Sequence, residues 1–257
     1  MHANLTLNLA TLCGFLLVLA RVSGLLAFVP IPGLAAGSDA GRAMLALALT
    51  VTLFPVWPHP EADALSTGKM AGWVLAEAGF GLTVGIAVSF LLEGIQLAAQ
   101  IVGLEAGYSF ASTIDPATQA DTTTLQVVAQ LFAGSLFFAL GFDRQVLHVL
   151  AASLEFIPSG ASVLTGSLVD AIGRLGSGIF STGLQLALPV LALTLLLDVA
   201  FAVLGRLHAQ LQLLSLSFAA KMLVSIGFLS GILTLYPPVF EKFGDATFGT
   251  LFKLLSR

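Results

Sequence analysis

The stretch Tyr108–Thr124, YSFASTIDPATQADTTT, separates two strongly apolar halves of the sequence. It carries two acids, Asp115 and Asp121, among many Ser, Thr and Gln residues. Because Pro116 disfavours helical geometry at the residue before it, we do not expect a helix to run through this stretch. At membrane depth, non-helical backbone survives only where protein or a water-filled cavity satisfies its polar groups. The stretch is therefore either an ordinary external loop or a segment that lines an aqueous path.

The composition on both sides of this stretch is that of a membrane protein. Of 257 residues, 57% are hydrophobic and 9% are charged, whereas a soluble domain carries about 25% charged residues. The formal net charge is −4, and the absence of a basic cluster argues against nucleic-acid binding. The single cysteine, Cys13, cannot form a disulfide within the chain. No Lys or Arg precedes the first apolar run, so we do not expect a signal peptide.

The N-terminal half predicts a helical hairpin followed by an overlong helix. Leu5–Val29 and Gly41–Trp57 are apolar runs separated by a Pro- and Gly-rich loop. As one helix, Lys69–Gly107 would be about 58 Å long, nearly double a hydrocarbon core of about 30 Å. It must therefore tilt, break or project beyond the bilayer. Gly81 and Gly85 form a small-xxx-small pair that allows close helix packing, either within the chain or between subunits.

The C-terminal half repeats this mismatch between helix length and bilayer thickness. Leu125–Ile157 is too long for one span and predicts a bent hairpin that turns at Gly141–Arg144. Ser167–His208 is also overlong, and Pro189 inside it predicts a helix kink. The run Leu211–Tyr236 follows.

A different kind of helix is expected at the C-terminus. Within Val239–Arg257, apolar residues recur mostly at helical spacing, which predicts an amphipathic helix for an interface or a partner. We expect a single domain over 1–257, with N-terminal helical hairpins at 1–107, a central loop at 108–124, C-terminal hairpins at 125–236 and the amphipathic helix at 237–257.

Charged residues inside apolar runs are candidates for function or for buried pairs. For Arg21, pairing with an acid on a neighbouring helix is the favoured interpretation. Asp198 and Arg206 lie about 80° apart on one helix, so we expect their partners to come from elsewhere. The predicted buried charges are Arg21, Glu77, Glu93, Glu105, Asp198, Arg206 and Lys221.

The sequence carries no recognisable catalytic or metal-binding motif. It lacks a nucleophile elbow, an H-E-x-x-H pair and a phosphate-binding Gly loop, and its four histidines are widely separated. We therefore expect no enzyme activity, no cofactor and no metal. An ion-coupled secondary transporter using Glu77, Glu93 and Asp198 is the alternative function. The two halves show no convincing repeat, although many transporters have one.

Several passages, in this order and spacing, resemble the FliR family of flagellar export-gate proteins and its injectisome relatives. The resemblance spans nearly the whole chain. Three positions depart from the family pattern: Asp198 stands where Asn is common, Ala209 where Pro is common and Gln212 where Asn is common. The passages are Ala20–Gly24 with Phe28–Pro30, Glu105–Gly107 with Asp115–Pro116, Gly183–Pro189, and Arg206 with Gln210, Phe218 and Lys221.

The resemblance implies a role that composition alone does not show. FliR proteins are non-enzymatic and join FliP and FliQ, one FliR copy per gate, in a cone of bent helical hairpins that also meets FlhB. Unfolded flagellar subunits pass through its centre. The chain is thus expected in the bacterial inner membrane at the flagellar basal body, and the sequence favours the flagellar over the injectisome system.

In the FliR family the central loop projects into the pore as a plug. By position this loop corresponds to Tyr108–Thr123, so the resemblance favours an aqueous path over an external loop. Tyr108, Phe110 and Ile114 are expected to help close the pore, while Ser109, Ser112 and Thr113 face water. The residues assigned to the plug are Tyr108, Ser109, Phe110, Ala111, Ser112, Thr113, Ile114, Asp115 and Pro116.

Overall fold

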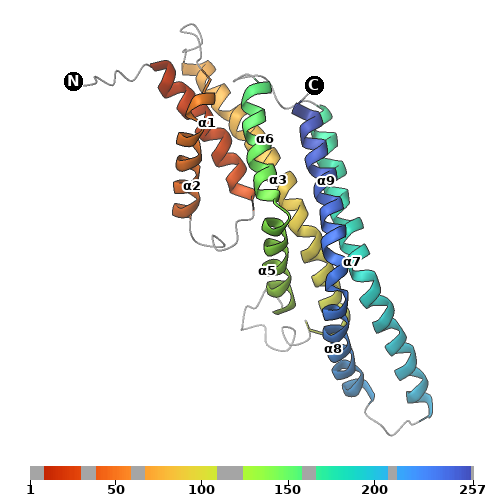
Figure 1. Cartoon of the computed structure of the whole chain (residues 1–257). Coiled ribbons are helices and arrows are strands. Elements are labelled where there is room, and N and C mark those ends of the chain that lie inside the picture. Colours follow the sequence, from red (N-terminus) through yellow and green to blue (C-terminus); the bar gives the residue numbers. More distant parts are fainter. Residues whose placement is uncertain are drawn as a thin grey trace. The chain divides into compact units, whose positions relative to one another are not determined.

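A computed structural model of the chain describes residues 9–29, 39–58, 67–108, 124–157, 166–207 and 213–255 (Figure 1). Within these ranges the chain is helical and no strand occurs. The all-α fold predicted from composition and apolar run length is therefore confirmed. The described chain divides into two compact units, 1–90 with 137–176 and 245–257, and 91–136 with 177–244. Four helices, α3, α5, α7 and α9, each contribute residues to both units.

In the first unit, α1 (Leu9–Phe28) and α2 (Asp39–Thr52) form the expected N-terminal pair (Figure 1). A short 3-10 turn, η1 (Phe54–Val56), follows α2. The Trp57 indole N–H donates a hydrogen bond of 2.8 Å to the Thr50 carbonyl, and its ring lies 5.3 Å from that of Phe15 on α1. Trp57 thus ties the end of α2 to α1.

Glycine allows α1 and α3 (Thr67–Glu105) to pack with their backbones in contact. A Cβ atom at Gly81 would overlap the Arg21 carbonyl, and one at Gly85 would lie 2.5 Å from the Leu25 carbonyl oxygen. Gly24 on α1 faces Ala78 in the same way. The small-xxx-small pair therefore serves packing within the chain, which was one of the two interpretations left open by the sequence.

The predicted turn between α5 (Thr124–Ala139) and α6 (Phe142–Phe156) is a break of two residues. Gly141 adopts φ 72°, a left-handed conformation that glycine accepts at little cost. The local bend is 63°, so the segment is a bent pair and not an antiparallel hairpin with two full spans. Phe142 on α6 is buried and contacts Phe248 on α9 at 5.4 Å between ring centroids.

In the second unit, the C-terminal part of α3 packs with α7 (Gly166–Leu207). A Cβ at Gly94 would touch Thr182, and one at Gly183 would touch Leu97. The helix α7 continues without interruption through Pro189, so the kink at this residue stays a prediction. The remaining elements are α8 (Leu213–Ile232) and the 3-10 turn η4 (Leu233–Leu235).

The C-terminal helix α9 (Tyr236–Leu255) uses its apolar face within the chain. In the second unit Phe240 is buried, and in the first unit Phe248, Leu251 and Leu255 are buried. The sequence predicted this face for an interface or a partner. Within this chain, most of that face is already covered by other residues of the chain.

Three helical segments in the described ranges are long and apolar enough to cross a membrane, or four if the bent α5–α6 pair counts as one span. They are Ala10–Phe28, Gly68–Glu105 and Val169–Leu207. In each of the first two segments, half of the most apolar 18-residue stretch is buried within the chain. In the third segment only 22% of that stretch is buried. Much of α7 therefore remains uncovered.

Candidate functional site

The C-terminal end of α3 leads directly into the central polar stretch and is shaped by a specific stop signal. The Gly107 N–H donates to the Leu104 carbonyl at 3.2 Å, and the Tyr108 N–H donates to the Gly103 carbonyl at 2.9 Å. Gly107 has φ 85°. These bonds and the left-handed glycine form a Schellman motif, which ends a helix by satisfying its last carbonyls. The sequence Glu105-Ala106-Gly107-Tyr108 therefore fixes where the chain leaves α3.

One face of α8 holds this end of α3. Phe218, Lys221, Met222 and Ser225 are spaced three, four and seven residues apart, so they share a helix face. They lie against Glu105, Gly107 and Tyr108 in the second unit. We call the contacts of Phe218, Lys221 and Met222 with Glu105, Gly107 and Tyr108 the α3–α8 clamp.

The clamp combines a hydrogen bond, a steric contact and an ion pair. The Tyr108 hydroxyl donates to the Met222 carbonyl at 2.8 Å, and Ser225 Oγ lies 3.5 Å from the same hydroxyl. A Cβ at position 107 would lie 3.0 Å from the Phe218 ring. Glycine is thus required at position 107 both by the backbone angle and by the space left by Phe218.

Lys221 connects the clamp to α7. Its Nζ lies 2.6 Å from Asp198 Oδ1 and 3.7 Å from Glu105 Oε1. Lys221 is buried, whereas the side chains of Asp198 and Glu105 are 42% and 41% exposed. One cation therefore faces two partly hydrated carboxylates, which leaves the cluster with a formal charge of −1. The expectation that the partner of Asp198 comes from another helix is confirmed.

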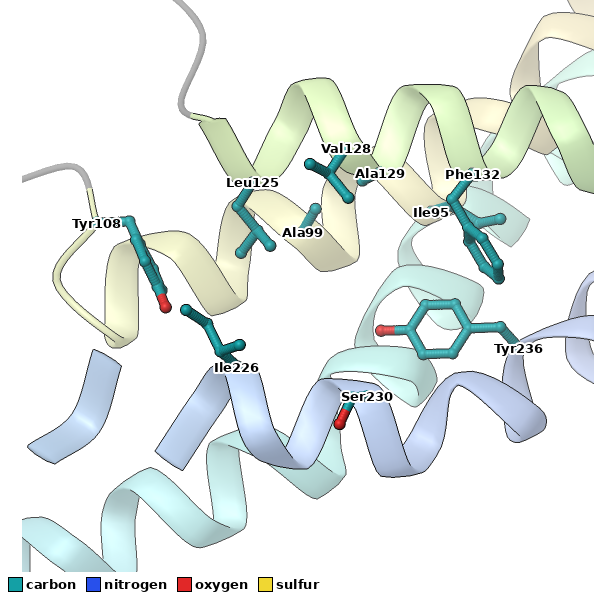
Figure 2. Close-up of a pocket in the computed structure, with 10 residues that line it drawn as sticks. All are labelled: Ile95, Ala99, Tyr108, Leu125, Val128, Ala129, Phe132, Ile226, Ser230 and Tyr236. Atoms are coloured by element: carbon teal, nitrogen blue, oxygen red, sulfur yellow. The ribbon is translucent and has the colours of Figure 1, made fainter. Parts of the chain in front are cut away.

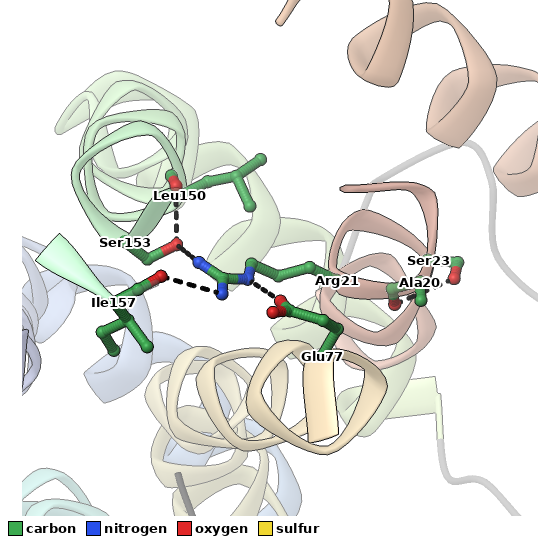
Figure 3. A network of polar contacts seen from close by, with 7 residues as sticks. All are labelled: Ala20, Arg21, Ser23, Glu77, Leu150, Ser153 and Ile157. Atoms are coloured by element: carbon green, nitrogen blue, oxygen red, sulfur yellow. Dashed lines mark hydrogen bonds and ion pairs between the residues drawn. The ribbon is translucent and has the colours of Figure 1, made fainter. Parts of the chain in front are cut away.

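A second ionic network lies in the first unit and is fully buried (Figure 3). Arg21 on α1 donates through Nε to the Glu77 carboxylate on α3, and both side chains are at most 3% exposed. Its Nη1 donates to Ser153 Oγ on α6 at 3.1 Å, and its Nη2 lies 3.5 Å from the Ile157 carbonyl. The prediction that Arg21 pairs with an acid on a neighbouring helix is confirmed.

Most of the predicted plug residues fall outside the described ranges, and several of the predicted buried charges are accessible to solvent. Of the plug residues, only Tyr108 belongs to the described part of the chain, and Ser109–Pro116 lie outside it. Glu93 and Arg206 are exposed, and Glu105 and Asp198 are only half-buried, so the prediction of a buried charge holds within this chain for Arg21, Glu77 and Lys221 alone.

Sequence reasoning missed several contacting residues. Nothing distinguishes Ser153 from other serines in apolar runs, and the backbone carbonyls of Met222 and Ile157 carry no sequence signal. The spacing of Phe218, Lys221 and Ser225 is the signal that could have pointed to the clamp, since it marks a common face of one helix.

The ion pairs of the described chain connect neighbouring helices. Among the described residues, no three His, Cys, Asp or Glu side chains gather as they would around a metal ion. The three acids proposed for a transporter do not converge. Glu77 is paired in the first unit, Asp198 is paired in the second, and Glu93 is exposed.

The class of protein defined by these features is an all-helical membrane protein with overlong helices and buried ionic cross-links. Comparison with known proteins gives the family. The model of bacterial export proteins, family 1, matches residues 12–246, and the chain belongs to this family.

Curated relatives agree with this assignment. The chain is 29% identical to the flagellar biosynthetic protein FliR of Escherichia coli (strain K12) over 240 residues, which cover 93% of the chain and 91% of the relative. It is 27% identical to the surface presentation of antigens protein SpaR of Salmonella typhimurium over 209 residues, 80% of the chain and 78% of the relative. The resemblance to the FliR family is therefore confirmed, and the chain is a membrane subunit of a flagellar or type III export apparatus.

Proposed function

We propose that the chain is a structural, non-enzymatic subunit of the export gate of the bacterial flagellum, present in one copy per gate. With FliP-like and FliQ-like subunits it forms the channel through which unfolded flagellar subunits pass, and an FlhB-like protein contacts it. The complex sits in the inner membrane at the flagellar basal body. The greater identity and coverage of the flagellar relative support the flagellar system.

The length of α3 and α7 is the observation that carries this proposal. They contain 39 and 42 residues, which correspond to about 58 and 63 Å of helix. A bilayer core of about 30 Å cannot cover such helices when they stand upright. Packing against similar helices of partner subunits would cover the remainder.

The uncovered side of α7 supports a stacked assembly. Phe180, Leu184, Leu188, Leu195 and Val199 are 48–69% exposed although they belong to a long apolar helix. A contiguous apolar face of this kind marks a contact with lipid or protein. In the proposed gate this face packs on the bent hairpins of a partner subunit.

The central loop, Tyr108–Thr123, acts as the plug of the closed pore in this proposal. Its N-terminal end is held by the α3–α8 clamp, since Tyr108 is hydrogen-bonded to Met222 and Gly107 lies against Phe218. A plug must yield to each passing substrate without being displaced from the pore. A fixed root followed by a polar, proline-containing segment suits that requirement.

The proposed assembly can be tested by coproduction. The tagged chain, produced together with its FliP-like and FliQ-like subunits, should purify as one large complex of fixed ratio, and the chain produced alone should be unstable. A monodisperse single chain that binds or moves a small solute by itself would instead favour the secondary transporter.

A further inference from the structure

A cavity of about 380 Å³ lies within the second unit, among α3, α5, α8 and the first residue of α9 (Figure 2). Its inner wall is formed by buried residues: Ile95 and Ala99 of α3 are at most 8% exposed, and Tyr236 is 6% exposed. This volume falls in the range of small-molecule sites, which is about 300–1,000 Å³.

The outer edge of the cavity is accessible from the surface of the chain. Val128 on α5 is 57% exposed and Ile226 on α8 is 54% exposed, and Ser230 on α8 is also exposed. A ligand can therefore enter between α5 and α8 from the medium that surrounds these helices. For a membrane protein with an apolar rim, that medium includes lipid chains.

The inner wall carries one unused polar group. The Tyr236 hydroxyl points into the cavity (Figure 2), and among the described residues none forms a hydrogen bond with it. Its ring is held edge-on by Phe132, with 5.9 Å between the ring centroids. Burial raises the pKa of Tyr236, so the hydroxyl remains a neutral donor at pH 7. The Tyr236 side chain is buried except at this hydroxyl, which faces the open cavity, so it is free to donate a hydrogen bond to a molecule bound there.

The size and polarity of the cavity select among possible occupants. Tyr108, Ser230 and Tyr236 bring hydroxyls to the lining, but those of Tyr108 and Ser230 already donate to the backbone carbonyls of Met222 and Gly227. Water in the cavity would therefore find fewer polar partners than the two to four that a stable buried water needs. A helix of a partner subunit is 10–12 Å wide, so one turn fills about 500 Å³ and exceeds the cavity. A single lipid chain is narrow and apolar, and its ester carbonyl can accept one hydrogen bond.

We propose that this cavity binds one acyl chain of a membrane phospholipid, whose ester carbonyl accepts a hydrogen bond from the Tyr236 hydroxyl. The bound chain lies along Ile95 and Ala99 and reaches Tyr108, which also lines the cavity. The site thus places lipid against the root of the central loop. This inference stands apart from the export role, because it requires only the second unit of the chain.

Photolabelling of the chain in its membrane complex tests the proposal. The complex is placed in nanodiscs of phosphatidylethanolamine and phosphatidylglycerol that contain a small fraction of phosphatidylcholine with a diazirine on one acyl chain. After illumination, peptide mass spectrometry should find adducts on the peptides that contain Ile95 and Ala99. Tyr236→Phe should lower this labelling about fivefold, the effect expected for one neutral hydrogen bond.

A second test fills the cavity with a larger side chain. Ala99→Phe should abolish the labelling at the inner wall, whereas Ala71→Phe, at an exposed alanine near the start of α3 and outside the cavity, should leave it unchanged. Copurification of the complex checks that each variant assembles. Adducts confined to exposed α7 residues such as Leu195, labelling unaffected by Tyr236→Phe, or cross-links from the inner wall to a partner subunit would each overturn the proposal.

Discussion

The two ionic networks of this chain differ in burial and in charge balance. In the first unit, Arg21 and Glu77 form a neutral pair that is almost completely excluded from solvent and shared by α1, α3 and α6. In the second unit, Lys221 faces Asp198 and Glu105, which remain partly exposed. Loss of one partner from a neutral buried pair leaves an uncompensated charge away from solvent. In the second network, loss of the lysine leaves two carboxylates that solvent can still reach. We infer that the first network fixes a permanent scaffold and that the second holds an element that must adjust.

The largest effect is expected from breaking the buried pair. Arg21→Ala leaves the Glu77 carboxylate buried without its cation, which costs about 3–5 kcal/mol. Thermal stability and yield of the purified complex should both fall sharply. The double variant Arg21→Met with Glu77→Leu should recover most of the loss, since apolar residues of similar volume often replace a buried ion pair without penalty. Equal loss in the single and double variants would refute the assignment of a buried pair.

A slightly smaller effect is expected at the α1–α3 contact in the same unit. Gly81→Ala places a Cβ against the Arg21 backbone, so the helices must separate, at a cost of about 1–3 kcal/mol. Gly79→Ala is the matched control, because a Cβ at Gly79 meets nothing within 4 Å. This control should be neutral or stabilise α3 by about 0.5–1 kcal/mol. The melting temperature should fall for Gly81→Ala and stay equal or rise for Gly79→Ala. Equal falls in both variants would argue against the close contact.

The second unit should respond more weakly to loss of its cation. Lys221→Met leaves Asp198 and Glu105 with access to solvent, so the expected loss is about 1 kcal/mol or less. High salt should reduce the difference between wild type and this variant, because exposed charges are screened. The Arg21 pair should show little salt dependence. A loss from Lys221→Met as large as that from Arg21→Ala would remove the distinction between the networks.

The smallest effect concerns the hydrogen bond of the clamp. Tyr108→Phe removes the bond to the Met222 carbonyl at a cost of about 1 kcal/mol. Amide exchange of the turn at 106–108 should quicken while exchange in the first unit stays unchanged. Unaltered exchange at this turn would show that Tyr108 does not hold the root of the loop.

The fold was largely predictable because two features of the sequence determine it: the length of the apolar runs and the Gly and Pro residues that end them. Overlong apolar runs predicted α3 and α7, and Gly141 predicted the break between α5 and α6. The spacing of Gly81 and Gly85 predicted that another helix packs closely against α3. It did not show which helix, because a spacing pattern describes only the helix that carries it.

The site was less predictable because its contacts join residues distant in sequence. The pairing of Arg21 with Glu77 spans 56 positions, and that of Tyr108 with Met222 spans 114. Exposure of Glu93 and Arg206 was missed because hydropathy does not tell which side of an apolar helix is covered. Partners that are backbone carbonyls, such as Met222, cannot be identified from side-chain type.

The measurement that tests the central claim most directly is ion leakage through an assembled gate that lacks residues 109–121. The deletion leaves the clamp residues Glu105, Gly107 and Tyr108 in place, and a Gly/Ser replacement of equal length separates closure from assembly. If the central loop seals the pore, the deletion should raise leakage strongly at unchanged complex yield, with a smaller rise for the Gly/Ser variant. Leakage equal to wild type in a correctly assembled deletion complex would contradict the plug role.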